Sequence, residues 1–223
     1  MPIRTSLEFL DISAFAMSLY CYHPLLPGPD KIRLLRLKPN EDETAPIQCE
    51  LFNYSLQKST KGTHLYEALS YVWGDPKETS PIRVDGDQFP VTVKLHEALS
   101  RLRDRSIERI IWVDAVCINQ NDDPEKKHQI GLMPKIYGQA NRVIIWLGEA
   151  ADDSDLAVEE IRVAGSKKST NSSNETIQQA ILALLGRSWF RRIWVRNRHS
   201  TTFAEITKSQ SRYFRKLPQL DMS

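Results

Sequence analysis

The sequence predicts an α/β fold: a mostly parallel sheet with flanking helices, preceded by N-terminal antiparallel strands and hairpins. Two near-continuous apolar runs, residues 110–118 and 143–147, flank a segment whose apolar residues recur at helical spacing. Strands that are apolar on both faces are typical of a parallel sheet covered by helices. We therefore interpret residues 109–148 as one βαβ unit, whose crossover should be right-handed.

The N-terminal half contains shorter strand patterns. Residues 31–37 and 47–56 alternate well enough for strands and are expected to pair as an antiparallel ribbon. Residues 66–73 read as a further strand. Asp85 and Gly86 lie between two more short strand patterns and predict a hairpin, because this dipeptide tolerates the positive φ that tight turns need.

Helical patterns follow these strands. Residues 95–103 form a short predicted helix with three leucines on one face. A longer helix should begin near Pro124, which suits a first helical turn. Pro134 lies inside that helix and is expected to kink or interrupt it, because proline removes a backbone hydrogen bond. Residues 155–163 and 177–185 are further predicted helices.

Composition excludes several classes of protein. The 223 residues are 41% hydrophobic and 26% charged, as expected of a globular protein. A net charge of +2 provides no general field for nucleic acid or an anionic membrane, so we expect neither as a partner. Three widely spaced cysteines form no disulfide framework and favour a reducing compartment, and we expect a cytoplasmic protein. The apolar stretch near the N-terminus is too short to span a bilayer.

Three sequence blocks carry a resemblance to a known family. They read YEALSYVWG (66–74), IWVDAVCINQ (111–120) and VIIWLG (143–148), and their order and spacing also match. In these blocks the chain resembles the heterokaryon incompatibility (HET) domain of filamentous fungi. The resemblance implies a TIR-like fold and a role in non-self recognition and programmed cell death signalling. It also implies protein partners, through self-association or through an allelic recognition protein.

The chain departs from the family pattern near its end. The family usually continues the Trp-Val pair with Gln-Glu, whereas here Val195 is followed by Arg196 and Asn197. We interpret this as a shifted reading frame or a read-through intron. The expected organisation is then a helical N-terminal extension at 1–23, a HET domain at 24–195 that is incomplete at its C-terminal end, and a divergent, disordered tail at 196–223.

Candidate ligand-binding residues follow from the predicted sheet, because parallel sheets place ligands at the carboxyl ends of their strands. Asp114 is a weak catalytic candidate: it interrupts an apolar run, and an unpaired buried carboxylate is costly. Its structural interpretation, as an acid paired to an arginine or capping a loop, has the greater weight. The full candidate set is Trp73, Gly74, Asp75, Asp114, Asn119, Gln120 and Glu149.

Two functions stay open, and whether the chain is an enzyme stays open with them. The first is a death-signalling module that acts by protein association. The alternative, which the resemblance implies, is a TIR-like NAD glycohydrolase that cleaves the nicotinamide–ribose bond. Such chemistry needs a carboxylate near the developing oxocarbenium ion. The absence of Gln-Glu after Val195 favours the first function, or a chain without this activity.

Other sites are expected to be absent. The five histidines are scattered, so no metal site is predicted. No cofactor is expected either, because NAD would be a substrate, and only if the chain is a glycohydrolase. Cys117 and His128 could form a thiol–imidazole nucleophile pair, but a thiol inside an apolar run is usually buried and inert. Trp73, Trp112 and Trp146 are interpreted as core or rim residues.

Overall fold

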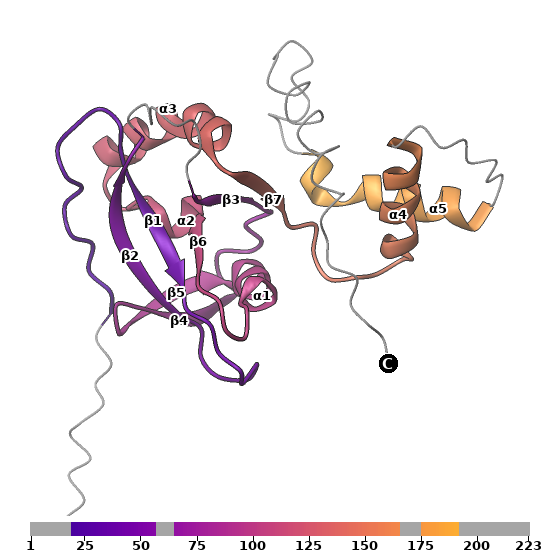
Figure 1. Ribbon diagram of the computed structural model, residues 1–223, viewed down its shortest axis with the longest axis horizontal. Coiled ribbons are helices and arrows are strands. Elements are labelled where there is room, and N and C mark those ends of the chain that lie inside the picture. The colour runs from indigo at the N-terminus through magenta and orange to yellow at the C-terminus, as the bar shows by residue number, and fades with distance from the viewer. Residues whose placement is uncertain (1–18, 57–64, 166–174, 192–223) are drawn as a thin grey trace, which may run out of the picture.

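The computed structural model describes residues 19–56, 65–165 and 175–191. Within these residues seven strands form one mixed sheet in the order β5-β4-β2-β1-β6-β3-β7 (Figure 1). The strands are β1 (Lys31–Leu37), β2 (Gln48–Ser55), β3 (Glu67–Ser70), β4 (Thr79–Val84), β5 (Asp87–Thr92), β6 (Arg109–Trp112) and β7 (Arg142–Ile145). The helices are α1 (Val93–Leu102), α2 (Asp114–Cys117), α3 (Asp123–Gln139), α4 (Ser154–Gly165), α5 (Glu175–Gly186) and the 3-10 turn η2 (Ser188–Arg191).

The α/β class is confirmed, but the sheet is mixed rather than mostly parallel. The pairs β2–β4, β3–β6 and β3–β7 are parallel, whereas β1–β2, β1–β6 and β4–β5 are antiparallel. Apart from the short β2–β4 pair, the parallel part of the sheet is the run of β6, β3 and β7. The predicted ribbon of β1 and β2 joins it through an antiparallel β1–β6 contact, which a pattern within single strands does not reveal.

The predicted βαβ unit is present with a third strand inside it. β6 and β7 are both parallel to β3, which lies between them, and α3 makes the connection. The predicted hairpin is also present between β4 and β5. Its turn residues Asp85 and Gly86 have φ of 53° and 96°, the positive values that a two-residue turn requires.

The run 110–118 is not one strand, so that prediction was wrong. β6 ends at Trp112, and α2 forms a helical turn in which the Ile118 N–H donates to the Asp114 carbonyl. A buried helix and a buried strand both read as continuous apolar sequence, which explains the error. Likewise β3 is shorter than the predicted strand 66–73 and covers only Glu67–Ser70.

Pro134 does not interrupt α3, which continues from Asp123 to Gln139. Proline leaves the carbonyl four residues earlier without its helical donor. That residue is Ile130, which lies on the exposed side of the helix. The helix begins as the sequence predicts: the Asp122 side chain caps it by accepting from the Glu125 N–H, and a proline follows.

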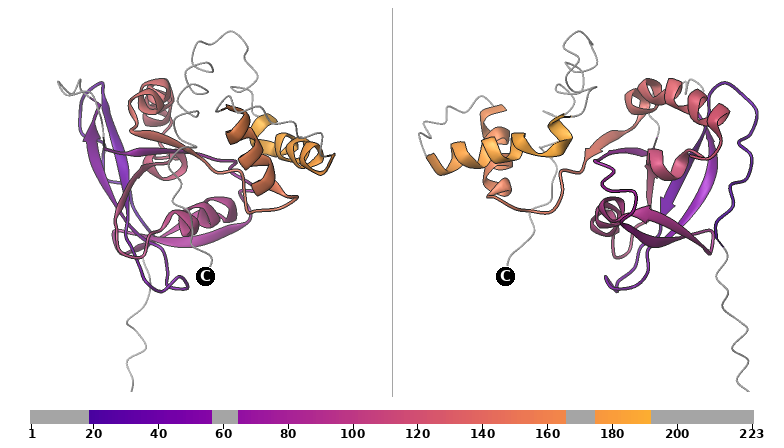
Figure 2. Two further views of the ribbon diagram at one scale, coloured as in Figure 1. Left: turned by 45° about the vertical axis from the view of Figure 1, so that its right-hand side comes forward. Right: turned by 180° about the vertical axis from the view of Figure 1, so that it is seen from behind.

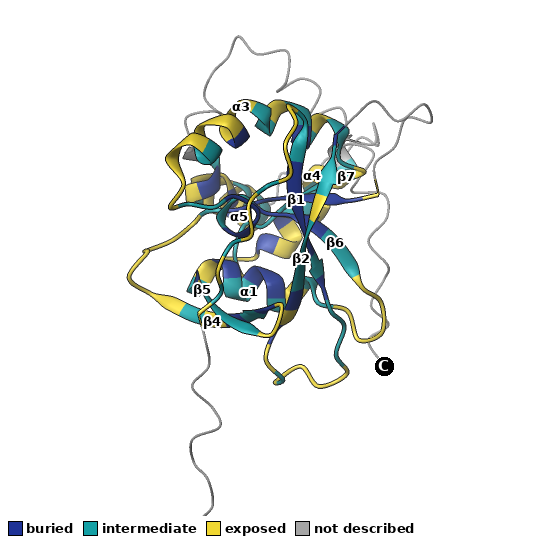
Figure 3. Cartoon of the chain, turned by 90° about the vertical axis from the view of Figure 1, so that its left-hand side faces the viewer, coloured by how far each residue is buried: buried dark blue, intermediate teal, exposed yellow. Residues whose placement is uncertain are grey.

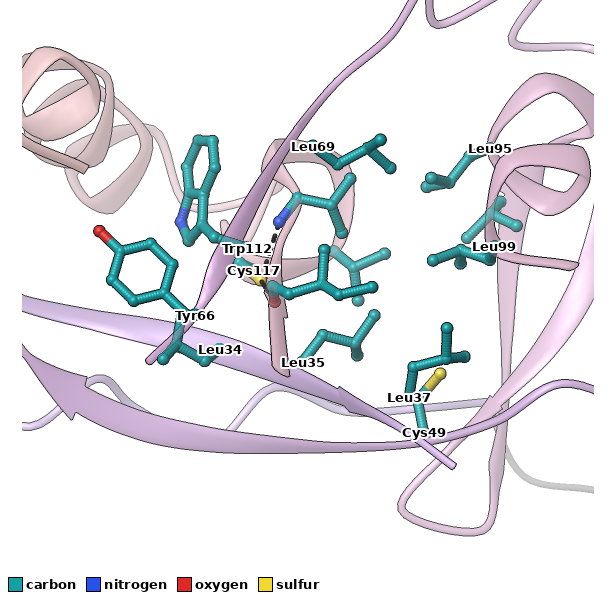
Figure 4. Close-up of a cluster of buried hydrophobic side chains, with 14 of the residues drawn as sticks. Leu34, Leu35, Leu37, Cys49, Tyr66, Leu69, Leu95, Leu99, Trp112 and Cys117 are labelled. Atoms are coloured by element: carbon teal, nitrogen blue, oxygen red, sulfur yellow. Dashed lines mark hydrogen bonds between the residues drawn. The ribbon is translucent and has the colours of Figure 1, made fainter. Parts of the chain in front are cut away.

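The core lies inside the curve of the sheet, where α1 packs against β4 and β5 and α2 packs against β1 (Figures 3 and 4). Leu95 and Leu99 of α1 are fully buried, as the predicted helix face requires. The Thr92 hydroxyl caps this helix by accepting from the Leu95 N–H. Two cysteines, Cys49 and Cys117, are buried here and are called the two buried thiols below.

The helices α4 and α5 confirm the predictions for residues 155–163 and 177–185 and stand to one side of the sheet (Figures 1 and 2). Their own core consists of Ala157, Ala180 and Leu184. Of the predicted N-terminal extension, residues 1–18 lie outside the described part of the chain. Residues 19–23 are not helical, because Leu19 forms a bridge with Gln88. The predicted tail at 196–223 also lies outside the described residues. None of the helices in the described part of the chain has the length and apolar character of a membrane-spanning helix.

Candidate functional site

The carboxyl ends of β3 and β7 open on a cavity of about 380 Å³. Gly74 and Glu149, two of the predicted ligand-binding residues, line it. The opposite wall comes from the end of α5 and from η2, with Arg187 and Trp189. The cavity therefore lies between the sheet and the α4–α5 unit, at the edge where parallel sheets usually bind ligands.

Two glycines shape the strand ends at this cavity. Gly74 has φ of 78° and Gly148 has φ of 100°, values that glycine adopts without strain. At Gly74 a Cβ atom would lie 2.8 Å from Cγ of Lys94, which belongs to the first turn of α1 and lines the same cavity. Gly74 is therefore required both for the turn and for the close approach of α1.

Asp114 lies next to this cavity but does not line it. Its Oδ2 accepts from the Trp73 indole N–H at 3.0 Å, and its Oδ1 accepts from the Ala115 N–H at 2.9 Å. The Gln120 amide donates to the Asp114 carbonyl at 2.9 Å. The structure thus brings Trp73, Asp114 and Gln120 into one cluster, in which the carboxylate stabilises the start of α2 and anchors Trp73.

Asn119 and Asp75 lie in turns. The Asn119 side chain accepts from the Asn121 N–H at 3.2 Å, and the Asp75 side chain accepts from the Lys77 N–H at 2.9 Å. Both are local turn bonds of the kind that Asn and Asp commonly form. The seven candidate residues therefore divide into two that line the cavity, three in the Asp114 cluster and two in turns.

Arg187 is a residue of the cavity wall that no sequence pattern predicted. Its guanidinium donates to the carbonyl oxygens of Leu147, Glu149 and Ala151, at 3.2, 3.2 and 3.0 Å. Trp189 donates its indole N–H to the Ser70 hydroxyl at 3.0 Å. These bonds attach the end of α5 to β3 and to the segment after β7. Both residues lie over 30 positions from the strand ends, so only three-dimensional proximity reveals their role.

A second missed feature is a buried ion pair behind the 117–120 segment. Arg33 of β1 and Glu125 of α3 form two bonds, at 2.5 and 3.0 Å, with side chains 5% and 10% exposed. Glu125 also accepts the Asn119 N–H at 2.9 Å, and Arg33 donates to the His23 carbonyl. The pair therefore joins β1, the α2–α3 loop and α3. An arginine inside an apolar strand was the signal for it in the sequence.

The cysteines and tryptophans are mostly structural residues, as the sequence predicted. Burial raises the pKa of the Cys117 thiol to about 12, and Cys117 lies in α2 rather than in a strand. His128 is exposed on α3, so the structure supports no thiol–imidazole pair. Trp112 is fully buried, whereas Trp146 lines the cavity. Among the described residues no group of three or more His, Cys, Asp or Glu side chains has the arrangement of a metal site.

Comparison with known proteins gives the family. The model of the family described as "Heterokaryon incompatibility protein (HET)" matches residues 66–197. The chain is also 36% identical over 149 residues to "Heterokaryon incompatibility protein 6, OR allele" of Neurospora crassa, which covers 61% of this chain and 21% of the relative. The chain thus spans about a fifth of the length of that relative. No solved structure matches. With a family match over more than half of its residues, the chain belongs to the heterokaryon incompatibility (HET) family.

Proposed function

We propose that the chain acts in non-self recognition and programmed cell death signalling, and that it acts by associating with other protein chains. The observation that carries this proposal is the apolar surface of the α4–α5 unit. Four large apolar side chains are exposed there: Leu156, Ile161, Leu182 and Leu185. We call these four exposed side chains the α4–α5 surface below.

The α4–α5 unit buries little of its own apolar surface. Its core has three buried residues, two of them alanines, whereas Leu182 and Leu185 are 69% and 48% exposed. Residues three apart lie side by side on a helix, so these two leucines form adjoining apolar surface on α5. Exposed apolar surface that is larger than scattered single residues is typical of a protein interaction site.

Expression in a filamentous fungus tests this proposal. The unaltered chain should arrest growth, and the double variant Leu182→Asp/Leu185→Asp should relieve the arrest, because two carboxylates cannot be buried against an apolar partner at low cost. The control is Ala183→Asp, which adds a charge at an exposed position of the same helix on a different side from Leu182 and Leu185. Arrest that persists in the double variant at equal protein level contradicts the proposal, as does a chain that causes none.

A second function, TIR-like cleavage of the nicotinamide–ribose bond of NAD, is favoured by the position of the cavity at the carboxyl ends of β3 and β7. This second proposal includes a TIR-like fold for the chain. Glu149 is the predicted carboxylate that lines the cavity, whereas Asp114 is bonded to Trp73 outside it. The pair Trp194-Val195 and the residues after it lie outside the described part of the chain.

Nicotinamide release from NAD by the purified chain tests the second function. If it holds, Glu149→Gln should abolish release, because the amide cannot stabilise a developing positive charge. Asp114→Asn is the comparison variant and should lower release less, since it acts through the position of Trp73. Release no faster than in a buffer blank excludes the activity.

A further inference from the structure

The outer edge of β2 is open along most of its length. β1 covers the inner edge completely, from Lys31 opposite Ser55 to Leu37 opposite Cys49. On the other side β4 pairs with Gln48 and Cys49 alone. No other strand of the described residues pairs with residues 51–55, and the coil of residues 20–30 passes on this side of β2 on its way from β5 to β1 (Figures 1 and 3).

The direction of the backbone groups on this edge follows from the bonds at its start. The carbonyls of Ile47 and Cys49 accept from β4, and the Leu51 N–H donates to the Asp85 carboxylate. In an antiparallel pair alternate residues bond to the partner strand, so the odd-numbered residues of β2 point away from β1. The carbonyl of Leu51 and both backbone groups of Asn53 and Ser55 therefore point outward.

Natural sheets usually block such an edge with proline, lysine or a bulge. β5, at the end of the sheet, shows this protection, since it contains Pro90 and its residue Gln88 forms a bridge with Leu19. Residues 51–55 read L-F-N-Y-S, with none of these side chains, and pair with β1 one to one without a bulge. A hollow of about 550 Å³ lies beside the start of this edge, between β2 and the β4–β5 hairpin tip.

We propose that the open edge of β2 pairs antiparallel with the same edge of a second copy of this chain, with Asn53 at the two-fold axis. This inference rests on the proposed function by association and names one of its partners. Asn53 then faces Asn53 of the partner copy and exchanges two backbone hydrogen bonds with it. The Ser55 N–H of each copy donates to the Leu51 carbonyl of the other, which gives four bonds while Asp85 keeps the Leu51 N–H.

The side chains also suit a second copy. The same register places Phe52 opposite Tyr54 of the partner copy, twice, and both are half-buried in one chain. Cross-strand aromatic pairs stabilise sheets. Of the carboxylates beside the edge, Glu50 bonds Arg36 and Lys38, each at 2.6 Å, and Asp85 accepts the Leu51 N–H of its own chain. Glu50 therefore adds little repulsion between two identical edges, and the hairpin tip confines the pairing to residues 51–55.

Sedimentation of the purified chain at concentrations up to about 100 μM, a range that detects weak association, tests the pairing. Asn53→Pro removes an outward N–H that β1 does not use, and edge positions tolerate proline. Its dissociation constant should rise at least about tenfold, whereas Asn53→Ala, which keeps the N–H, should dimerise as the unaltered chain does. Thermal unfolding of both variants checks that the monomer is folded.

A charge exchange makes the test specific for the two-fold axis and does not need the proline variant to fold. Asn53→Lys and Asn53→Glu should each be monomeric, because like charges meet across the axis, and their mixture should dimerise. A mixture that associates no better than either variant alone overturns the inference, as does an unaltered chain that stays monomeric. Loss of growth arrest by the α4–α5 variant bears on the proposed function and leaves this measurement unaffected.

Discussion

Replacing Glu125 by alanine removes one partner of the Arg33–Glu125 pair, the most buried ion pair among the residues that the structure describes. The buried Arg33 guanidinium would then have no carboxylate partner, and the Asn119 N–H would lose its acceptor. Breaking a buried pair in this way typically costs about 3–5 kcal/mol. Arg33 keeps the carbonyls of His23 and Cys117, so we expect the lower end, about 3 kcal/mol.

Urea denaturation measures this loss directly, and the melting temperature should fall by about 6–12 °C for a domain of this size. The double variant Arg33→Met/Glu125→Met should recover most of the stability, because apolar side chains of similar volume can replace a buried pair. Glu43→Ala is the matched control, since it breaks the exposed pair with Arg105. If Glu125→Ala is no more destabilising than Glu43→Ala, the buried pair does not hold these elements together.

Three further results are expected. Gly74→Ala should destabilise the chain by about 1–3 kcal/mol in urea denaturation, and more than Gly86→Ala, because both have positive φ but only at Gly74 would a Cβ meet Lys94. Native protein at pH 8 should react rapidly with a thiol reagent at the exposed Cys21, whereas the two buried thiols should react only on unfolding, because burial raises the pKa of each to about 12. These pKa values exceed the ordinary thiol value of 9.0, so the unfolded chain loses protons first and the free energy of unfolding should fall as the pH rises above about 9, which titration of the urea midpoint will show.

Local patterns predicted most of the elements. The alternation in 31–37 and the Asp85-Gly86 turn depend on neighbouring residues alone, and both appear in the structure as expected. The run 110–118 was misread, because full burial removes the polar residues that distinguish a helical turn from a strand. The order of strands was not predictable in the same way, since the position of β3 between β6 and β7 depends on contacts across about 75 residues.

The candidate site shows the same limit. Gly74 and Glu149 were found from the rule that ligands bind at strand ends, and both line the cavity. Arg187 and Trp189 form the opposite wall, because α5 folds back toward β3. The interruption of an apolar strand by Arg33 marked a buried charge, but its partner Glu125 is 92 residues away and follows only from the packing of α3.

The two proposed association surfaces have different consequences because they lie at different places in the sheet. β2 is on the far side of β1 from β7, after which the chain leads into the α4–α5 unit (Figure 1). Pairing through β2 uses the same residues in both copies, so it closes at a dimer and does not extend into a filament. Such a dimer leaves two α4–α5 surfaces free. A partner with two matching sites would then bind the dimer far more tightly than the monomer, because its second contact is intramolecular. Self-pairing would in this way convert a weak apolar contact into a concentration-dependent signal.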